Sequence, residues 1–251
     1  MSSNETSPEQ PALRPERPEP HDGGSGNGLA QRLNWLRAGV LGANDGIVST
    51  SAVVVGVAGA TSDIRAVATA GIAAVIGGAV SMALGEYVSV SSQRDTERAY
   101  IAKETALHNA DPDSEFAHLV AAYEATGLSR ETATQVATER TAADPLKAHL
   151  EVHYGINEED LVNPWSAAIA SFIAFSLGAL LPLAAVLLPP DAWRVPVTFV
   201  VTLLALAITG AVSARIGGAE PKRAVLRLVI GGALGLAVTF GVGWAFGTTA
   251  L

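Results

Sequence analysis

Five stretches of this chain are each apolar over about 20 residues, the length that an α-helix needs to cross the hydrocarbon core of a bilayer. They are Leu36–Ala60, Ala66–Val90, Trp165–Leu188, Val195–Ala214 and Ala224–Phe246. A backbone in lipid must satisfy its own hydrogen bonds, and the small apolar residues of this chain suit closely packed helices. The sequence therefore predicts an all-α integral membrane bundle of five transmembrane helices. The absence of Cys excludes disulfides and thiolate metal sites.

The basic residues orient this bundle in the membrane. With the N-terminus on the cytoplasmic side, only Arg65 and Arg194 of the 16 Lys and Arg residues fall on the outer side. Lys and Arg near the ends of membrane spans favour the cytoplasm, so we expect the N-terminus inside and the C-terminus outside. The short chain without a recognisable organelle-targeting signal favours a bacterial inner membrane.

The polar regions divide the chain into four parts. Residues 1–33 are rich in Pro, Glu, Ser and Gly, which predicts a disordered cytoplasmic tail. Residues 34–92 hold the first two transmembrane helices and residues 164–251 the last three, with a polar module at 93–163 between them. The module holds fourteen acidic and six basic side chains, so its net charge of −8 equals that of the whole chain. This balance favours cations, not nucleic acid, as partners.

The polar module is predicted to be helical. The second span continues without Gly or Pro as far as about His108. Helix-start signals follow at Asp111-Pro112, Ser129 and Asp144-Pro145, with stop signals at Gly127 and Gly155. The sequence therefore predicts a cytoplasmic helical insert between the second and third transmembrane helices.

Three pairs of potential metal ligands lie on the helices of this insert. They are Glu104 with His108, Glu115 with His118, and His149 with His153. Residues three or four positions apart share a helix face, and carboxylates and imidazoles that converge from several helices bind divalent transition metals. We therefore predict a metal-binding domain with these six residues as candidate ligands. The alternative is a solvated amphipathic face whose histidines lie at contacts between partners.

The predicted spans also hold a carboxylate at a depth where lipid is expected. Asp45 lies about 13 Å into the first span, and Met82 lies about 15 Å from the same face in the second. A charge near the bilayer centre costs about 3 kcal/mol or more, so it usually faces protein or a water-filled path. A carboxylate with a thioether suits Fe²⁺ or Mn²⁺ better than Mg²⁺ or Ca²⁺. Glu86, one turn closer to the cytoplasm, completes a predicted transport path; alternatively, Asp45 is structural and Met82 only fills space.

Two long motifs carry a resemblance to a known family. The segments Leu36–Ser49 (LRAGVLGANDGIVS) and Gly85–Glu97 (GEYVSVSSQRDTE) are similar to those of the vacuolar iron transporter family, as are the five spans and the acidic insert. The resemblance covers residues from about Asn34 to the C-terminus. It implies a homodimer that moves Fe²⁺, often Mn²⁺, out of the cytosol in exchange for protons, with the metal as substrate and bound ion and no prosthetic group.

The same resemblance assigns roles to individual residues. It implies that Asp45 and Met82 line the transport path, and that Glu104 and Glu115 belong to the metal-binding pattern of the cytosolic domain. The chain departs from the family at four positions of the insert, where Leu107, His118, His149 and His153 replace the residues expected there. The predicted metal site is therefore richer in imidazole than the family pattern.

Two other functions stay open at this point. One is a membrane-anchored metal sensor or buffer without transport, although an anchor alone needs no buried carboxylate. The other is an enzyme, a membrane di-iron carboxylate oxidase, which needs paired Glu-x-x-His motifs on its helices. The sequence offers one such motif, Glu115–His118, so the prediction is a transporter and not an enzyme.

Overall fold

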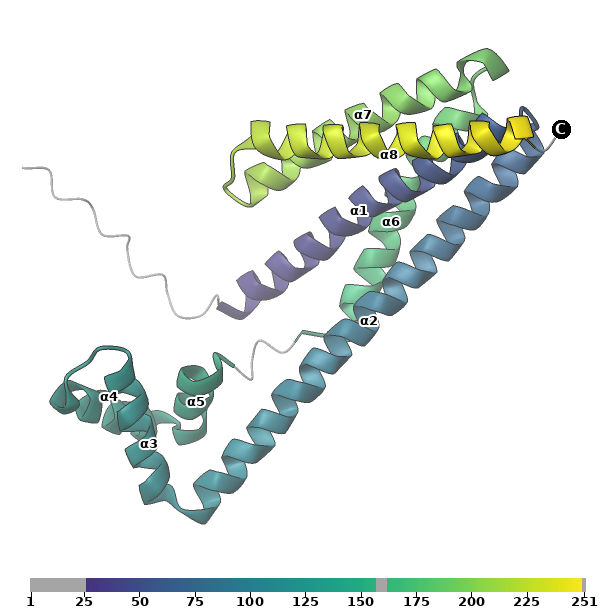
Figure 1. Cartoon of the computed structure of the whole chain (residues 1–251). Coiled ribbons are helices and arrows are strands. Elements are labelled where there is room, and N and C mark those ends of the chain that lie inside the picture. The colour runs from purple at the N-terminus through teal and green to yellow at the C-terminus, as the bar shows by residue number, and fades with distance from the viewer. Residues whose placement is uncertain (1–25, 157–161, 250–251) are drawn as a thin grey trace, which may run out of the picture.

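The computed structural model describes residues 26–156 and 162–249, with side chains from residues 39 to 156 and 162 to 248. These residues form helices and no strand, as predicted. Five of the helices are long and apolar enough to cross a membrane. They are α1 (Gly26–Ala60), α2 (Ile64–Ala110), α6 (Pro164–Leu187), α7 (Asp191–Ile216) and α8 (Pro221–Thr249). The predicted bundle of five transmembrane helices is therefore confirmed, and Figure 1 shows how the five helices are arranged.

Close backbone contact holds α1 against α6. A Cβ atom on Gly46 would overlap the carbonyl oxygen of Phe175, and one on Gly178 would overlap the carbonyl oxygen of Ala43. Glycines on both helices thus permit an approach that any larger residue would prevent, which is how transmembrane helices gain packing energy in lipid. This contact fixes the position of α1, the helix that carries Asp45.

We expect Gly46→Ala to lower the stability of the bundle. The new methyl group meets backbone atoms of α6 that cannot rotate away, and overpacking of this kind costs roughly 1–3 kcal/mol. Thermal unfolding of the purified protein in detergent measures the effect. Gly231→Ala is the matched control, because a Cβ on Gly231 meets no atom within 4 Å. Equal unfolding temperatures for the two variants would contradict the α1–α6 contact.

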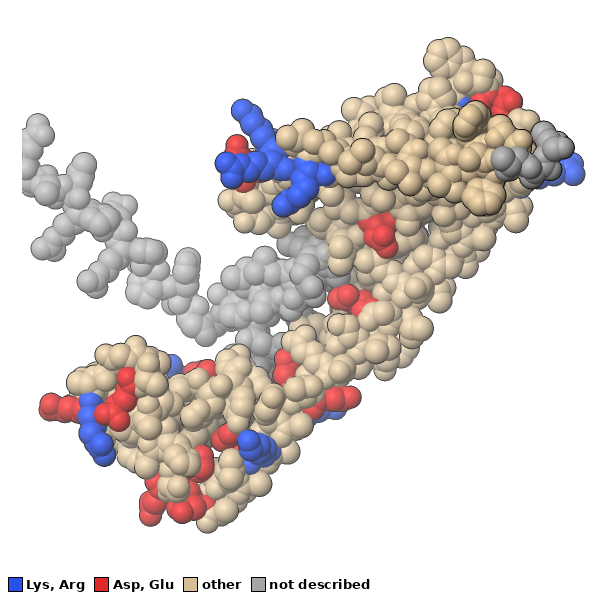
Figure 2. Space-filling view, in the orientation of Figure 1, with Lys and Arg blue, Asp and Glu red and all other residues tan. Residues whose placement is uncertain are grey.

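The helical insert lies between α2 and α6. It contains α3 (Pro112–Ala125), α4 (Arg130–Ala143), α5 (Pro145–His149) and a π-helical turn, η1 (Leu150–Tyr154). Its separate core consists of the buried residues Leu119, Val120, Ala133, Ala137 and Ala148. Several acidic side chains lie on the surface of this unit with a few basic ones among them, whereas basic side chains gather at the turn between α7 and α8 (Figure 2). On which side of the membrane the insert lies stays a prediction.

The helix boundaries agree with most of the start and stop signals. The side chains of Asp111, Ser129 and Asp144 accept hydrogen bonds from backbone N–H groups in the first turns of α3, α4 and α5. Gly127 and Gly155 end their helices in the left-handed region, at φ 98° and 62°. The α2 helix continues out of its apolar part to Ala110, as predicted.

Two predicted helices differ most from the structure. The α1 helix begins at Gly26, ten residues before the predicted start at Leu36, so part of the predicted tail is helical; residues 1–25 lie outside the described residues. The helix predicted from Asp144 to Gly155 changes from α to π geometry after His149. Periodicity in the sequence does not distinguish these two geometries over so few residues.

Candidate metal centre

Three side chains from three helices meet inside the insert. Glu104 comes from the extension of α2, Glu115 from the first turn of α3, and His149 from the end of α5. Their potential ligand atoms lie within 4.8 Å of one another, and the three residues are 5%, 6% and 3% exposed. Buried carboxylates are costly unless they are paired, so this cluster indicates that a positive charge belongs between them.

The geometry of His149 fits a shared ion better than hydrogen bonds. Its Nδ1 atom lies 3.6 Å from Oε2 of Glu115 and 3.8 Å from Oε2 of Glu104, and this buried nitrogen has no hydrogen-bond partner. Both distances are too long for a hydrogen bond. Two ligands at tetrahedral corners, each about 2.1 Å from an ion, are about 3.4 Å apart. The distances from this nitrogen to the two oxygens are therefore close to those between ligands of one divalent transition metal.

The second oxygen of each carboxylate has a partner of its own. Tyr154 donates its hydroxyl hydrogen to Oε1 of Glu104, with an O···O distance of 2.8 Å. His118 Nδ1 lies 3.3 Å from Oε1 of Glu115, on a side chain that is 63% exposed. Each glutamate thus directs its other oxygen, Oε2, toward His149.

Burial favours the neutral form of the central imidazole. Loss of solvation lowers the pKa of His149 below 6.5, and the neighbouring rings of His153 and His108 lower it further. The carboxylates of Glu115 and Glu104 oppose this shift without cancelling it. A neutral imidazole has a lone pair to offer a metal ion. The hydrogen bond to Glu104 raises the pKa of Tyr154, so its hydroxyl keeps its proton.

The other three predicted ligands border the cluster without joining it. The ring centres of His108 and His153 lie 6.3 Å and 5.5 Å from that of His149. Nδ1 of His108 is buried without a hydrogen-bond partner, whereas His153 is exposed. His118 contacts Glu115 from the surface. Coordination by these three histidines stays a prediction.

Tyr154 is the neighbour of the cluster that the sequence did not reveal. It follows His149 by five positions, a spacing that places two side chains on different faces of an α-helix. The π turn η1 widens the helix, and both residues then contact Glu104. A stack of the Tyr154 ring on Tyr100, with centres 4.5 Å apart, holds it there.

The candidate residues of the transport path lie on α1 and α2. Asp45 is exposed on α1, and its carboxylate has no ion-pair partner among the residues whose side chains are described. Met82 is half-buried and packs against the buried cluster of Ala79, Phe175 and Ala179. Glu86 is half-buried one turn further along α2. Their joint role in a path stays a prediction.

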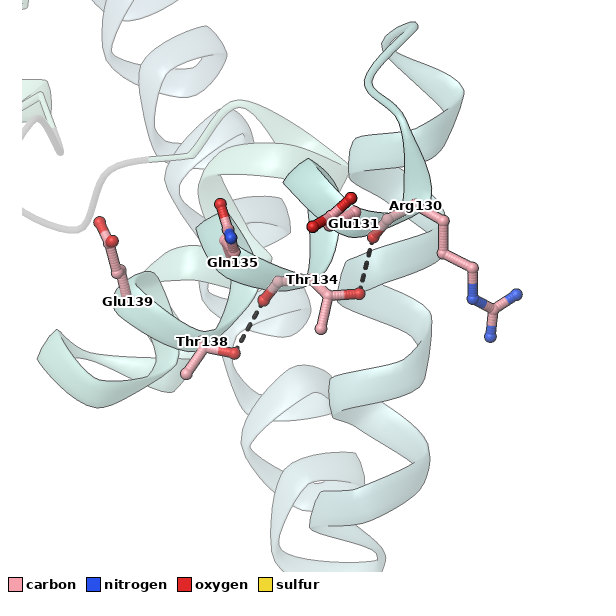
Figure 3. A pocket seen from close by; sticks show the side chains of 6 residues that line it. All are labelled: Arg130, Glu131, Thr134, Gln135, Thr138 and Glu139. Atoms are coloured by element: carbon pink, nitrogen blue, oxygen red, sulfur yellow. Dashed lines mark hydrogen bonds between the residues drawn. The ribbon is translucent and has the colours of Figure 1, made fainter.

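A hollow on the outer face of α4 offers no comparable chemistry. Six residues line it, as Figure 3 shows: Arg130, Glu131, Thr134, Gln135, Thr138 and Glu139. Its threonine hydroxyls donate to backbone carbonyls of the same helix, Thr134 to Arg130 and Thr138 to Thr134. None of its residues belongs to the cluster of Glu104, Glu115 and His149.

Comparison with known proteins identifies the family. The model of the VIT family matches residues 36–244, which cover most of α1 and α8, the three other apolar helices and the insert. The chain belongs to the VIT family. A "Vacuolar iron transporter" of Acanthamoeba castellanii is 40% identical over 211 residues, which cover 84% of this chain and 78% of that protein. "Vacuolar iron transporter homolog 1" of Oryza sativa subsp. japonica is 38% identical over 229 residues, covering 91% and 80%.

A third relative has a similar name and a similar coverage. "Vacuolar iron transporter homolog 2.1" of Arabidopsis thaliana is 33% identical over 222 residues, which cover 88% of this chain and 85% of that protein. Family membership and the five apolar helices together make this chain an integral membrane protein. The predicted resemblance to the vacuolar iron transporter family is confirmed.

Proposed function

We propose that this VIT-family protein exports Fe²⁺ or Mn²⁺ from the cytosol in exchange for protons. The observation that carries the proposal is the carboxylate of Asp45, exposed on the apolar helix α1. A charge on a lipid-facing surface is costly, so a path for cations explains its presence there. The named relatives are iron transporters, which supports a metal cargo. The function is transport, with no enzymatic step.

A second copy of the chain covers the exposed Asp45 in this proposal. The α1 helix packs against α6 with one face, whereas Asp45 and Leu41 are exposed on another. A homodimer that joins two such faces removes the carboxylates from lipid and encloses a polar path between two copies of α1. Met82 and Glu86 on α2 supply a thioether and a second carboxylate along this path.

The insert gathers the ion before it enters the membrane. Glu104, Glu115 and His149 bind Fe²⁺ or Mn²⁺ on the cytoplasmic side, and the net charge of −8 in the predicted module attracts cations toward them. In this orientation, which the basic residues support, the N-terminus is cytoplasmic and the C-terminus lies outside. A bacterial inner membrane suits this arrangement.

Uptake by sealed liposomes tests the proposal. Protein reconstituted with a metal-sensitive dye inside the vesicles is expected to move Fe²⁺ or Mn²⁺, at a rate that rises when the vesicle interior is acidified. A proton flux in the opposite direction, followed with a pH dye, is the expected counterpart. Metal binding without uptake under any pH gradient would indicate a membrane-anchored sensor or buffer instead.

We expect Met82→Leu to change which ions pass. The substitution nearly conserves volume, so its cost in stability against Phe175 and Ala179 is below about 1.5 kcal/mol. Loss of the thioether removes a soft ligand, and transport of Fe²⁺ should fall relative to that of Ca²⁺. The reverse substitution Leu84→Met, on an exposed face of the same helix, is the control and should leave this ratio unchanged. An unaltered ratio for Met82→Leu would reduce Met82 to a packing residue.

A further inference from the structure

We infer that Tyr154 is a positioning residue that restricts Glu104 to one-oxygen coordination and thereby favours transition metals over Ca²⁺. The inference rests on the metal-gathering role proposed for Glu104, Glu115 and His149. It concerns which ions that site accepts, and it follows from the contacts of the two oxygens of Glu104.

The two oxygens of Glu104 are held in different roles. Oε1 accepts the hydrogen bond from the Tyr154 hydroxyl at 2.8 Å, and Oε2 lies 3.8 Å from Nδ1 of His149. A carboxylate that binds a metal through both oxygens must turn both of them toward the ion. To turn Oε1 toward the ion as well, Glu104 must rotate its carboxylate out of the position in which Tyr154 now donates to it, and at 5% exposure it has little access to water as a replacement donor.

The position of Tyr154 is itself fixed. The π turn η1 brings Tyr154 to the same carboxylate as His149, and Gly155 ends the turn in the left-handed region. The Tyr154 ring stacks on Tyr100 with an angle of 22° between the planes. Both rings come from elements that frame the site, Tyr100 from α2 and Tyr154 from η1. The hydroxyl is therefore directed at Glu104 by a rigid support.

This restriction selects between classes of cation. Ca²⁺ takes about six to eight oxygen ligands and often binds carboxylates through both oxygens. A site of one nitrogen and two single carboxylate oxygens suits Fe²⁺, Co²⁺ or Zn²⁺. By holding Oε1 of Glu104 away from the ion, Tyr154 keeps the number of protein oxygens low. Partners that orient a metal ligand in this way commonly change affinity about 10–100-fold.

The test compares Tyr154→Phe with Tyr100→Phe in the full-length protein. Both variants keep an aromatic ring in the stack, and only Tyr154→Phe removes the hydroxyl that contacts Glu104. Binding of Co²⁺ and Ca²⁺ is measured by calorimetry in detergent, and the visible absorption of bound Co²⁺ reports its coordination number. The wild type and Tyr100→Phe are expected to bind Co²⁺ in a low-coordinate form that absorbs strongly.

For Tyr154→Phe we expect the preference for Co²⁺ over Ca²⁺ to fall by about tenfold or more. The Co²⁺ absorption should also weaken as the freed carboxylate raises the coordination number. An unchanged preference together with an unchanged spectrum would overturn the role of Tyr154 and leave the metal site intact. If the wild type binds no Co²⁺, the proposed metal site fails, and the inference fails with it. A structural effect of ring loss is excluded because both variants retain the ring.

Discussion

Asp45→Asn is expected to abolish most metal transport while the protein still folds and inserts. The amide has the same shape as the carboxylate but carries no negative charge for a passing cation. Charged hydrogen-bonding groups contribute about 1.5–3 kcal/mol, and loss of that much from the rate-limiting step slows it by about tenfold or more. Because Asp45 is exposed on α1, its replacement leaves the buried contacts of α1 with α6 unaltered.

The measurement is initial uptake of Fe²⁺ or Mn²⁺ into liposomes that contain equal amounts of each variant. Asp63→Asn is the matched control, since it also removes one negative charge. Asp63 caps α2 by accepting a hydrogen bond from the Arg65 backbone, and Asn is an equally good cap. Uptake by Asp45→Asn at the rate of this control would make Asp45 structural and would remove the main support for the proposed path.

The bundle could be predicted because its signals are local. A stretch of about 20 apolar residues identifies a membrane span without reference to the rest of the chain. The caps at Asp111, Ser129 and Asp144 act within one turn of their own helices, and all three were placed correctly from sequence. The start of α1 at Gly26 was missed because polar residues there resemble a tail, and nothing local marks where a helix continues beyond the membrane.

The metal centre could be predicted in part. Spacing along each helix identified three pairs of candidate ligands, but it gave no reason to prefer one member of a pair over the other. Glu104, Glu115 and His149 converge because α2, α3 and α5 pack around them, which is a tertiary effect. His118 and His149 look alike in the sequence, yet one is 63% exposed on its side chain and the other is buried.

The role of Tyr154 could not be predicted from the spacing of residues along an α-helix. Residues five positions apart share a face only when the helix takes π geometry, and no residue pattern in η1 predicts that geometry. Packing of Tyr154 on Tyr100, 54 positions earlier in the chain, accompanies the π turn. Where backbone geometry depends on such distant contacts, a sequence alone cannot assign the residues that orient a ligand.

His149→Ala is expected to lower the affinity of the insert for Co²⁺ or Fe²⁺ by about 100-fold. Loss of a direct ligand exceeds the effect of its supporting partners, which is about 10–100-fold. The two buried carboxylates, each with Oε2 near Nδ1 of His149, would also be left without their central partner. His118→Ala is the control, because His118 contacts only the outer oxygen of Glu115 from an exposed position, so its loss should lower the affinity less than the loss of His149 does.

The pH dependence of metal binding distinguishes the contribution of the His149 imidazole from that of the two carboxylates. Burial lowers the pKa of His149 below 6.5, with His153 and His108 adding to the shift and Glu115 and Glu104 opposing it. The neutral ligand is therefore fully present above pH 6.5, and metal affinity declines as the pH falls through the lowered pKa of the folded protein. Calorimetry on the full-length protein at several pH values should give this decline in the wild type and in His118→Ala, but not in His149→Ala. The same affinity and pH profile for His149→Ala and the wild type would mean that His149 is not a ligand, and the carboxylates would then hold the ion by themselves.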